Sequence, residues 1–252
     1  MTDQDSARQP KYQRIADELR TAIQSGDFAP GDRLPGENDL MTTYDVARMT
    51  ARQALSVLRT EGLAEARKGA GVFVRAFRPL RRRGIPRLAG ERWGNGHSVW
   101  STEVEDRDLV VDRVEVGEKP AGDRIAQVLD VVPGTPLCVR SRRFVLDGRP
   151  VLLSVSYLSA ELVSGTQIAE PDTGPGGTYA RLAELGQRPV HFREEIRCRM
   201  PTVDESDRLA LEFGTPVVLI ERTAYTETGR AVELNEMTLD SSSYVLEYGF
   251  DA

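Results

Sequence analysis

Apolar residues in the first third of the chain recur with the spacing of amphipathic helices. In residues 12–25 they stand three and four positions apart, which places them on one stripe of a helix. A second helix is predicted to open at Gly36, and a third to cover residues 47–61. Residues 63–66 and 72–75 have the pattern of short strands around a Gly-rich turn. Three helices followed by a hairpin predict a winged helix-turn-helix. The predicted buried face of the third helix consists of Ala51, Ala54, Leu55 and Leu58.

In the rest of the chain, one series of predicted helices, turns and strands occurs twice. Each copy has a predicted helix, a Gly-Thr-Pro turn, a strand, a turn containing Gly-Arg and a second strand. The Gly-Thr-Pro turns are residues 134–136 and 214–216, and Thr202 with Glu205 forms a capping-box pattern ahead of the second copy's helix. Two such units are predicted to pair into one antiparallel sheet with helices on a face, an α+β architecture. A pseudo-symmetric pair of this kind leaves a cleft between its halves, where we expect a small ligand to bind.

Residues 77–96 separate the two patterns. They are rich in Pro, Gly and Arg and have no clear periodicity, which is typical of a linker. The predicted organisation is therefore a helix-turn-helix domain at 1–76, a linker at 77–96 and a repeat-containing domain at 97–252. The linker arginines allow two interpretations, a solvated segment or a set of contacts with a phosphate backbone. These arginines are Arg78, Arg81, Arg82 and Arg83.

Charge is divided unevenly along the chain. The net charge is −6, but residues 1–87 hold 16 Lys and Arg against 11 Asp and Glu, whereas residues 88–252 hold 17 against 28. A positive first part on a negative second part directs attraction for a polyanion to one end. Taken alone, the asymmetry could also arise by chance between two ordinary domains.

Composition excludes several classes of protein. The two cysteines have no CxxC spacing, so we expect no metal, no cofactor and no disulfide. The polar N-terminus lacks the apolar core of a secretion signal, and no apolar run approaches the roughly 20 residues that span a bilayer. We therefore expect a cytoplasmic protein with no membrane partner.

The start of the third predicted helix carries polar side chains away from its apolar stripe. A recognition helix enters the major groove by its N-terminal end, where Arg can contact a guanine edge and Gln an adenine edge. Glycines in the hairpin allow its backbone to approach DNA, and a basic side chain beside them can reach phosphate. An ordinary solvated helix face is the alternative. The candidate DNA contacts from this pattern are Arg48, Met49, Thr50, Arg52, Gln53, Arg67, Lys68 and Gly69.

The repeat-containing domain offers candidate ligand groups. Arg140 and Arg142 lie two apart in a predicted strand and therefore project from the same face. On an inward face this pair is costly unless an anion neutralises it, and on an outward face it is merely solvated. Glu233 can accept hydrogen bonds from hydroxyls or an amine. Tyr179 opens a predicted helix after a Gly-rich loop, at residues 174–177, whose amides can bind an anion.

A set of residues in the first domain matches a known family in order and spacing. They are Leu34-Pro35, Glu37, Leu40, Val46, Arg48, Thr50, Arg52, Ala54-Leu55, Leu58, Glu61-Gly62-Leu63 and residues 69–74. On these residues the chain resembles the GntR family of bacterial transcription regulators. The resemblance implies DNA contacts at Arg48, Thr50, Arg52 and the wing-tip residue Gly69. Asn38 stands where many members carry a DNA-contacting Arg, so it joins the candidates and leaves the operator sequence open. Ala47 replaces the usual Ser or Thr helix cap.

The second domain carries a further set of matching motifs. They are residues 133–136, 140–142, 147–150, 214–216 and 229–233. On these motifs it resembles the UTRA effector-sensing domain of the HutC subgroup, which has a chorismate-lyase-like fold and binds small molecules, in several cases phosphorylated sugars. The resemblance implies ligand contacts at Arg140, Arg142, Tyr179 and Glu233. Ser154 stands where many relatives have a Glu and joins the candidate effector contacts, and Gly177 stands where binders of sugar phosphates have a Ser. The identity of the effector therefore stays open.

These observations predict a ligand-responsive transcription regulator, and more specifically a repressor. It is expected to be a homodimer whose two recognition helices bind double-stranded DNA at a near-palindromic operator, with the second domain serving for sensing and dimerisation. One alternative is a constitutive repressor whose second domain only dimerises. Another is a lyase-like enzyme, although the two histidines, His97 and His191, stand outside any catalytic motif. We therefore expect no catalytic residues.

Overall fold

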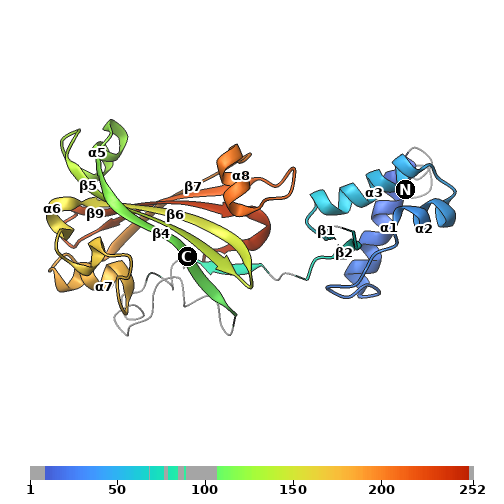
Figure 1. Cartoon of the computed structure of the whole chain (residues 1–252), viewed down its shortest axis with the longest axis horizontal. Helices are drawn as coiled ribbons and strands as arrows, with labels where there is room; N and C mark the ends of the chain where they lie inside the picture. The colour runs from blue at the N-terminus through green and yellow to red at the C-terminus, as the bar shows by residue number, and fades with distance from the viewer. Residues whose placement is uncertain (1–8, 68, 77–78, 85–87, 89–106, 250–252) are drawn as a thin grey trace. The chain divides into compact units, whose positions relative to one another are not determined.

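The computed structural model describes residues 9–67, 69–76, 79–84, 88 and 107–249. The chain divides into two compact units, Met1–Arg78 and Pro79–Ala252 (Figure 1). Within the described residues, no helix is both long and apolar enough to cross a membrane.

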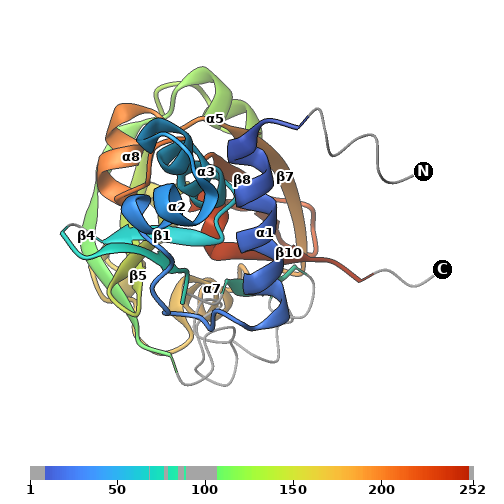
Figure 2. The same ribbon diagram turned by 90° about the vertical axis from the view of Figure 1, so that its right-hand side faces the viewer.

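The first unit is a winged helix-turn-helix, as predicted. Its helices are α1 (Lys11–Ser25), α2 (Glu37–Tyr44) and α3 (Arg48–Thr60), and its hairpin pairs β1 (Ala64–Arg67) with β2 (Gly71–Val74). Both α1 and α2 pack against α3 (Figure 2). The four residues predicted for the buried face of α3 are all buried, in one core with side chains of α1 and α2. The helix ends follow local chemistry, because α1 stops at Gly26 with a φ of 88°, a left-handed conformation that glycine adopts without strain.

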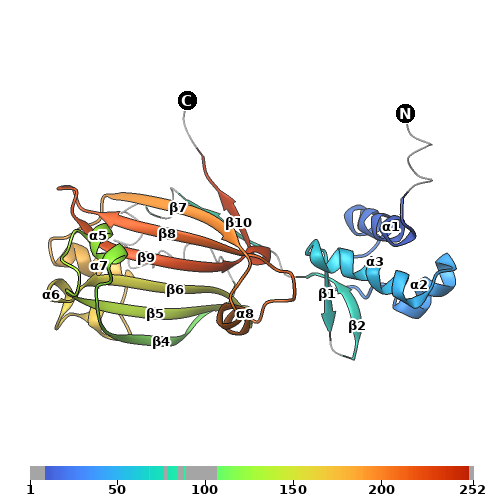
Figure 3. The ribbon, with the colours of Figure 1, turned by 90° about the horizontal axis from the view of Figure 1, so that it is seen from above.

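The second unit contains one antiparallel sheet of six strands. They are β4 (Leu109–Pro120), β5 (Pro136–Leu146), β6 (Arg149–Ser159), β7 (His191–Arg199), β8 (Val217–Tyr225) and β9 (Ala231–Asp240). Their order in the sheet is β4-β5-β6-β9-β8-β7 (Figure 3). The two predicted hairpins are β5–β6 and β8–β9, and they meet through the pairing of β6 with β9. The internal repeat therefore forms the centre of the sheet.

Helices cover both faces of this sheet. The helices of the two repeats, α5 (Asp123–Leu129) and α8 (Val203–Leu209), pack on one face, against side chains such as Leu137 and Leu153. The opposite face packs against α6 (Ala160–Val163), η3 (Gln167–Ala169) and α7 (Gly177–Glu184). We call this opposite face the site face, because Arg140 and Arg142 belong to it. The sequence pattern predicted the helix at Tyr179 but placed the repeat helices on one face only, and it missed α6 and η3 because they are too short to show a helical period.

The predicted linker is wrong at residues 80–83. These residues form strand β3 (Leu80–Arg83), which pairs in parallel with β10 (Tyr244–Glu247), a strand that follows the short helix η4 (Ser241–Ser243). Along β3, Leu80 and Arg82 are buried while Arg81 and Arg83 are exposed. Arg82 is fully buried, so it cannot contact DNA as one interpretation of the linker arginines allowed. Arg78 lies outside the described residues.

Candidate functional site

The predicted recognition face lies on the surface of the first unit. The side chains of Arg48 and Arg52 are both 60% exposed, Met49 is 68% exposed, and Gln53 and Asn38 are exposed. Thr50 is half-buried. The N-terminal turns of α3 therefore present the polar residues that groove contact requires.

Glu37 of α2 holds the two arginines of this face. Arg52 donates from Nε to Glu37 Oε1 at 2.7 Å and from Nη2 to Oε2 at 3.2 Å. Arg48 Nε lies 3.9 Å from Glu37 Oε2, and its Nη2 donates to Asn38 Oδ1 at 3.1 Å. The hydrogen bond from Arg52 lowers the pKa of the Glu37 carboxyl. One carboxylate thus orients two guanidinium groups toward the same surface.

The hairpin brings further candidates to its tip. Arg67 and Gly69 are exposed, and Gly69 has a φ of 74°. The Arg67 guanidinium lies 4.4 Å from the centre of the Phe73 ring and donates to Glu65 Oε1 at 3.0 Å. These contacts stiffen the base of the wing. Lys68, the other basic candidate, lies outside the described residues.

A row of polar side chains crosses the site face of the second unit. Its members occupy directly paired positions on five neighbouring strands, so the row runs perpendicular to the strands. We call it the polar row, and from β5 to β7 it consists of Arg140, Ser156, Asn235, Arg222 and Glu194. The first four are buried, and the Glu194 side chain is 9% exposed. Such a row in a sheet interior requires specific polar partners, because an unpaired buried polar group is costly.

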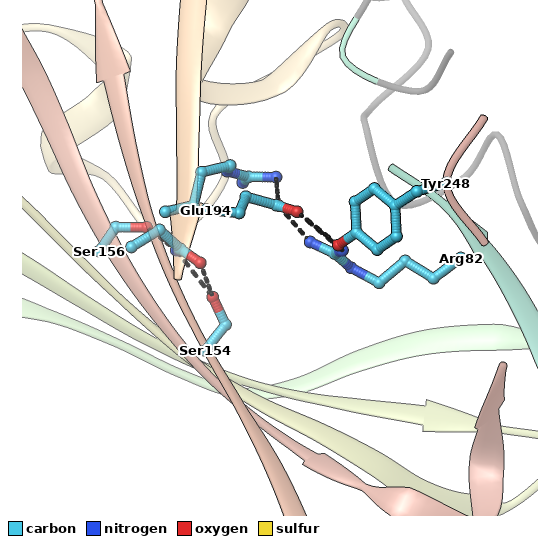
Figure 4. Close-up of polar contacts among 7 residues, drawn as sticks. Arg82, Ser154, Ser156, Glu194 and Tyr248 are labelled. Atoms are coloured by element: carbon cyan, nitrogen blue, oxygen red, sulfur yellow. Dashed lines mark hydrogen bonds and ion pairs between the residues drawn. The ribbon is translucent and has the colours of Figure 1, made fainter. Parts of the chain in front are cut away.

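Hydrogen bonds join the centre of the polar row to Ser154 and Arg142. Asn235 Nδ2 donates to Ser154 Oγ at 2.9 Å and to Ser156 Oγ at 2.6 Å. Arg142 Nη2 donates to Ser156 Oγ at 2.9 Å. Ser154 and Ser156 lie together in this network (Figure 4). Arg142 is therefore held by a neutral acceptor.

Arg140 is held by backbone carbonyl oxygens. Its Nη1 donates to the carbonyl oxygens of Ile168 and Glu170, and its Nη2 donates to that of Pro171 at 3.1 Å. These bonds fix the segment that leads toward α7. Only its Nε has no hydrogen-bond partner among the described residues.

Buried polar atoms without a described partner gather around these arginines. They include the Nε atoms of Arg140 and Arg142, Oε2 of Glu233 and Oγ1 of Thr178. Burial lowers the pKa of Arg142 to about 10, so its guanidinium is charged at neutral pH, and Glu233, Arg140, Arg222 and Tyr179 all act on it electrostatically. Tyr179 is buried on α7, with its ring 5.3 Å from that of Phe192. The structure thus brings the five predicted effector residues to one face of the sheet.

A buried ion pair ties β3 to the polar row. Arg82 Nη1 donates to Glu194 Oε2 at 3.0 Å, its Nη2 donates to Oε1, and Tyr248 Oη donates to Oε2 at 3.0 Å. Arg82, Glu194 and Tyr248 form this cluster in Figure 4. Arg222 Nη1 lies 4.0 Å from the same carboxylate. Sequence patterns did not predict that these side chains belong to one site: Arg82, Arg222, Glu194, Ser156 and Asn235.

In the part of the chain that the structure describes, no group of three or more His, Cys, Asp or Glu side chains is placed to hold a metal ion.

Comparisons with known proteins agree with this architecture. The family model for bacterial regulatory proteins of the gntR family matches residues 11–74, and the model for the UTRA domain matches residues 106–245. An HTH-type transcriptional regulator from Streptomyces coelicolor is 32% identical over 240 residues, which cover 89% of this chain and 86% of that protein.

Two further relatives cover nearly the whole chain. The HTH-type transcriptional repressor NagR of Bacillus subtilis is 24% identical over 245 residues, 96% of this chain and 95% of that protein. A crystal structure of a GntR-family transcriptional regulator superimposes with a TM-score of 0.62 at 27% identity, covering 97% of this chain and 98% of that chain. The names of these relatives describe regulators of transcription and no enzyme.

Proposed function

This chain belongs to the GntR family of bacterial regulatory proteins and carries a UTRA domain, and from that premise we propose how its residues bind DNA and an effector. The chain is a DNA-binding transcription regulator, not an enzyme, and the pairing of a GntR helix-turn-helix with a UTRA domain is that of the HutC subgroup. We propose that it is a repressor, and that binding of a small molecule releases it from its operator.

The DNA contacts are assigned to the exposed start of α3 and to the wing tip. Arg48, Met49, Thr50, Arg52 and Gln53 face the major groove, with Asn38 beside them, and Arg67, Lys68 and Gly69 contact the backbone or the minor groove. The exposure of Arg48 and Arg52 and their fixed position on Glu37 support this assignment. A homodimer presents two such faces to a near-palindromic operator.

The effector site is assigned to Arg142, Glu233, Tyr179 and Ser154, with Arg140 shaping its wall. The buried polar atoms without a described partner carry this assignment, because a domain that only dimerises has no need for them. A small molecule with an anionic group could accept a hydrogen bond from Arg142. If the same molecule carries hydroxyls or an amine, these can donate to Glu233, so that both the buried donor and the buried acceptor gain a partner.

Strand β3 offers a physical link from this site to the DNA-binding unit. It begins directly after residue 79, at the boundary between the two units, and Arg82 fastens it to Glu194 of the polar row. We infer that a ligand on the site face changes how β3 is held and thereby where the two DNA-binding units can lie. A coupling of about 1–3 kcal/mol is typical of such a linkage.

The test uses the full chain and its operator. A metabolite library is screened by thermal shift, and hits are added to an operator mobility-shift assay. We expect at least one hit to weaken operator binding of the wild type. Arg142→Gln should bind operator as the wild type does but lose the response. If no metabolite changes operator affinity, or if Arg142→Gln responds normally, the effector assignment is wrong.

A further inference from the structure

One large apolar side chain is exposed on the recognition face of the first unit. Met49 is 68% exposed, whereas every other large apolar side chain among the described residues of this unit is buried or half-buried. Those other side chains form the core of the unit or pack against it. An apolar side chain left in water forfeits the free energy that burial would supply. A partner that covers Met49 therefore gains from the contact.

Helix geometry places Met49 at the centre of the exposed face of α3. The buried stripe of this helix consists of Ala51, Ala54, Leu55 and Leu58. At 3.6 residues per turn, Met49 lies about 170° around the helix axis from the centre of that stripe. Its position is therefore almost directly opposite the core that α3 shares with α1 and α2. On a helix that enters a groove, this is the position that faces the base edges.

Polar side chains flank Met49 on both sides of this face. Arg48 and Arg52 lie on one side, where Glu37 of α2 holds both guanidinium groups. Gln53, which is exposed, lies on the other side and one turn further along the helix. Arginine can contact a guanine edge and glutamine an adenine edge, each through hydrogen bonds. Met49 offers a flexible apolar side chain instead, so it is suited to a different feature of the groove.

The base edges in the major groove present one apolar group. Guanine, cytosine and adenine present hydrogen-bond donors and acceptors there, whereas thymine presents an acceptor and its C5 methyl group. Contact between a methionine side chain and this methyl group removes both from water. We propose that Met49 contacts the C5 methyl group of one thymine in each half-site and is a specificity-determining residue of operator recognition. The inference rests on the proposed DNA-binding function and adds to it the chemical group that is recognised.

The experiment compares thymine with deoxyuracil, which differs from it only in lacking the C5 methyl group. The full chain first selects an operator from a library of random duplexes, and each thymine of that operator is then replaced singly by deoxyuracil. For the wild type, the replacement at one position in each half-site should weaken binding by about fourfold, since the burial of one methyl group is lost. Met49→Ala should bind the thymine and deoxyuracil forms of that position equally.

Two further variants make the result specific to the apolar contact. Met49→Leu keeps a large apolar side chain and should keep the preference for thymine. Met200→Ala removes a methionine that is 58% exposed in the second unit, and it should show the wild-type preference.

The possible outcomes separate this inference from the function on which it rests. A selected operator in which no thymine is sensitive to loss of its methyl group overturns the inference and leaves DNA binding intact. The same holds if Met49→Ala keeps the full preference of the wild type for thymine. If the full chain selects no operator from the library, the proposed function itself is wrong, and the role of Met49 falls with it.

Discussion

At the scale of single residues, arginines of the second unit are buried where a carboxylate or a carbonyl oxygen accepts their hydrogen bonds. Arg82, in a run of three arginines, is fully buried because Glu194 accepts from both of its terminal nitrogens. Its neighbour Arg81 is 63% exposed and pairs with Glu247 at 3.2 Å in solvent. The same residue type therefore has two energetic roles at adjacent positions, because a buried charge must be paired whereas an exposed one is already hydrated.

This difference predicts the effect of Arg82→Met. The substitution removes the guanidinium that binds both oxygens of the buried Glu194 carboxylate, so the free energy of unfolding should fall by about 3 kcal/mol. The control is Arg81→Met, which removes an exposed pair and should cost less than about 1 kcal/mol. Urea denaturation of the full chain measures both values. Equal losses in the two variants would show that the Arg82–Glu194 pair is not buried in solution.

At the scale of elements, helix α8 shows how local sequence sets a boundary. Thr202 Oγ1 accepts from the Glu205 amide at 3.3 Å, and Glu205 Oε2 accepts from the Thr202 amide at 2.8 Å, as the capping-box pattern predicted. Arg199 at the end of β7 also donates to both oxygens of Glu205 at 2.7 Å. The cap therefore fixes both the start of α8 and its attachment to the preceding strand.

The same contacts predict a pH dependence for Glu205→Gln. The hydrogen bond from Arg199 is the main cause that lowers the pKa of Glu205 from 4.5 to about 2. A carboxyl whose pKa is lowered by folding stabilises the protein above its ordinary pKa, and this contribution is lost as the pH falls from 4.5 toward 2. Gln keeps the cap but not the charge, so the variant should lose about 1 kcal/mol at neutral pH after allowance for solvent screening.

The measurement is the free energy of unfolding as a function of pH. The wild type should lose its advantage over Glu205→Gln as the solution is acidified, and the two curves should meet near pH 2. Asp204→Asn, which changes an exposed neighbour on the same helix, should follow the wild type. Parallel curves for wild type and Glu205→Gln would contradict the assigned pKa.

At the scale of the whole molecule, charge and core are both divided between the two units. Each unit encloses its own buried apolar cluster, with Leu40 and Leu58 in the first and Leu158 and Leu182 in the second. Residues 1–78 hold 12 Lys and Arg against 11 Asp and Glu, a net charge of +1, whereas residues 79–252 hold 21 against 28, a net charge of −7. A polyanion is therefore repelled by the second unit, and its attraction to the first depends on exposed arginines such as Arg48 and Arg52.

This division predicts which arginines set the salt dependence of operator binding. If Arg67 at the wing contacts a phosphate, Arg67→Gln should reduce the slope of log affinity against log salt by about 0.9. Arg14→Gln removes an exposed charge from α1 that is not among the assigned DNA contacts, and should leave the slope unchanged. Titration of operator at several salt concentrations measures the slopes. An unchanged slope in Arg67→Gln would remove the wing residue from the phosphate contacts.

Local patterns in the sequence were sufficient for much of this protein. The three helices of the first unit, its hairpin, the capping box of α8 and the two hairpins of the repeat were all predictable, because each depends on apolar spacing and turn residues within a few positions. The alternation of β5 placed Arg140 and Arg142 on one face for the same reason.

Tertiary structure alone decided the rest. Strand β3 has no periodic signal of its own, and Arg82 is buried only because β10 and Glu194, more than a hundred residues away, pair with it. Arg222 stands eight residues after Gly214, as Arg142 stands eight residues after Gly134. The side chains that surround Arg222 nevertheless depend on the pairing of β8 with β7 and β9. A chain's periodicity records which face of an element is buried, whereas the partner that faces it is fixed by long-range pairing, which leaves no local trace.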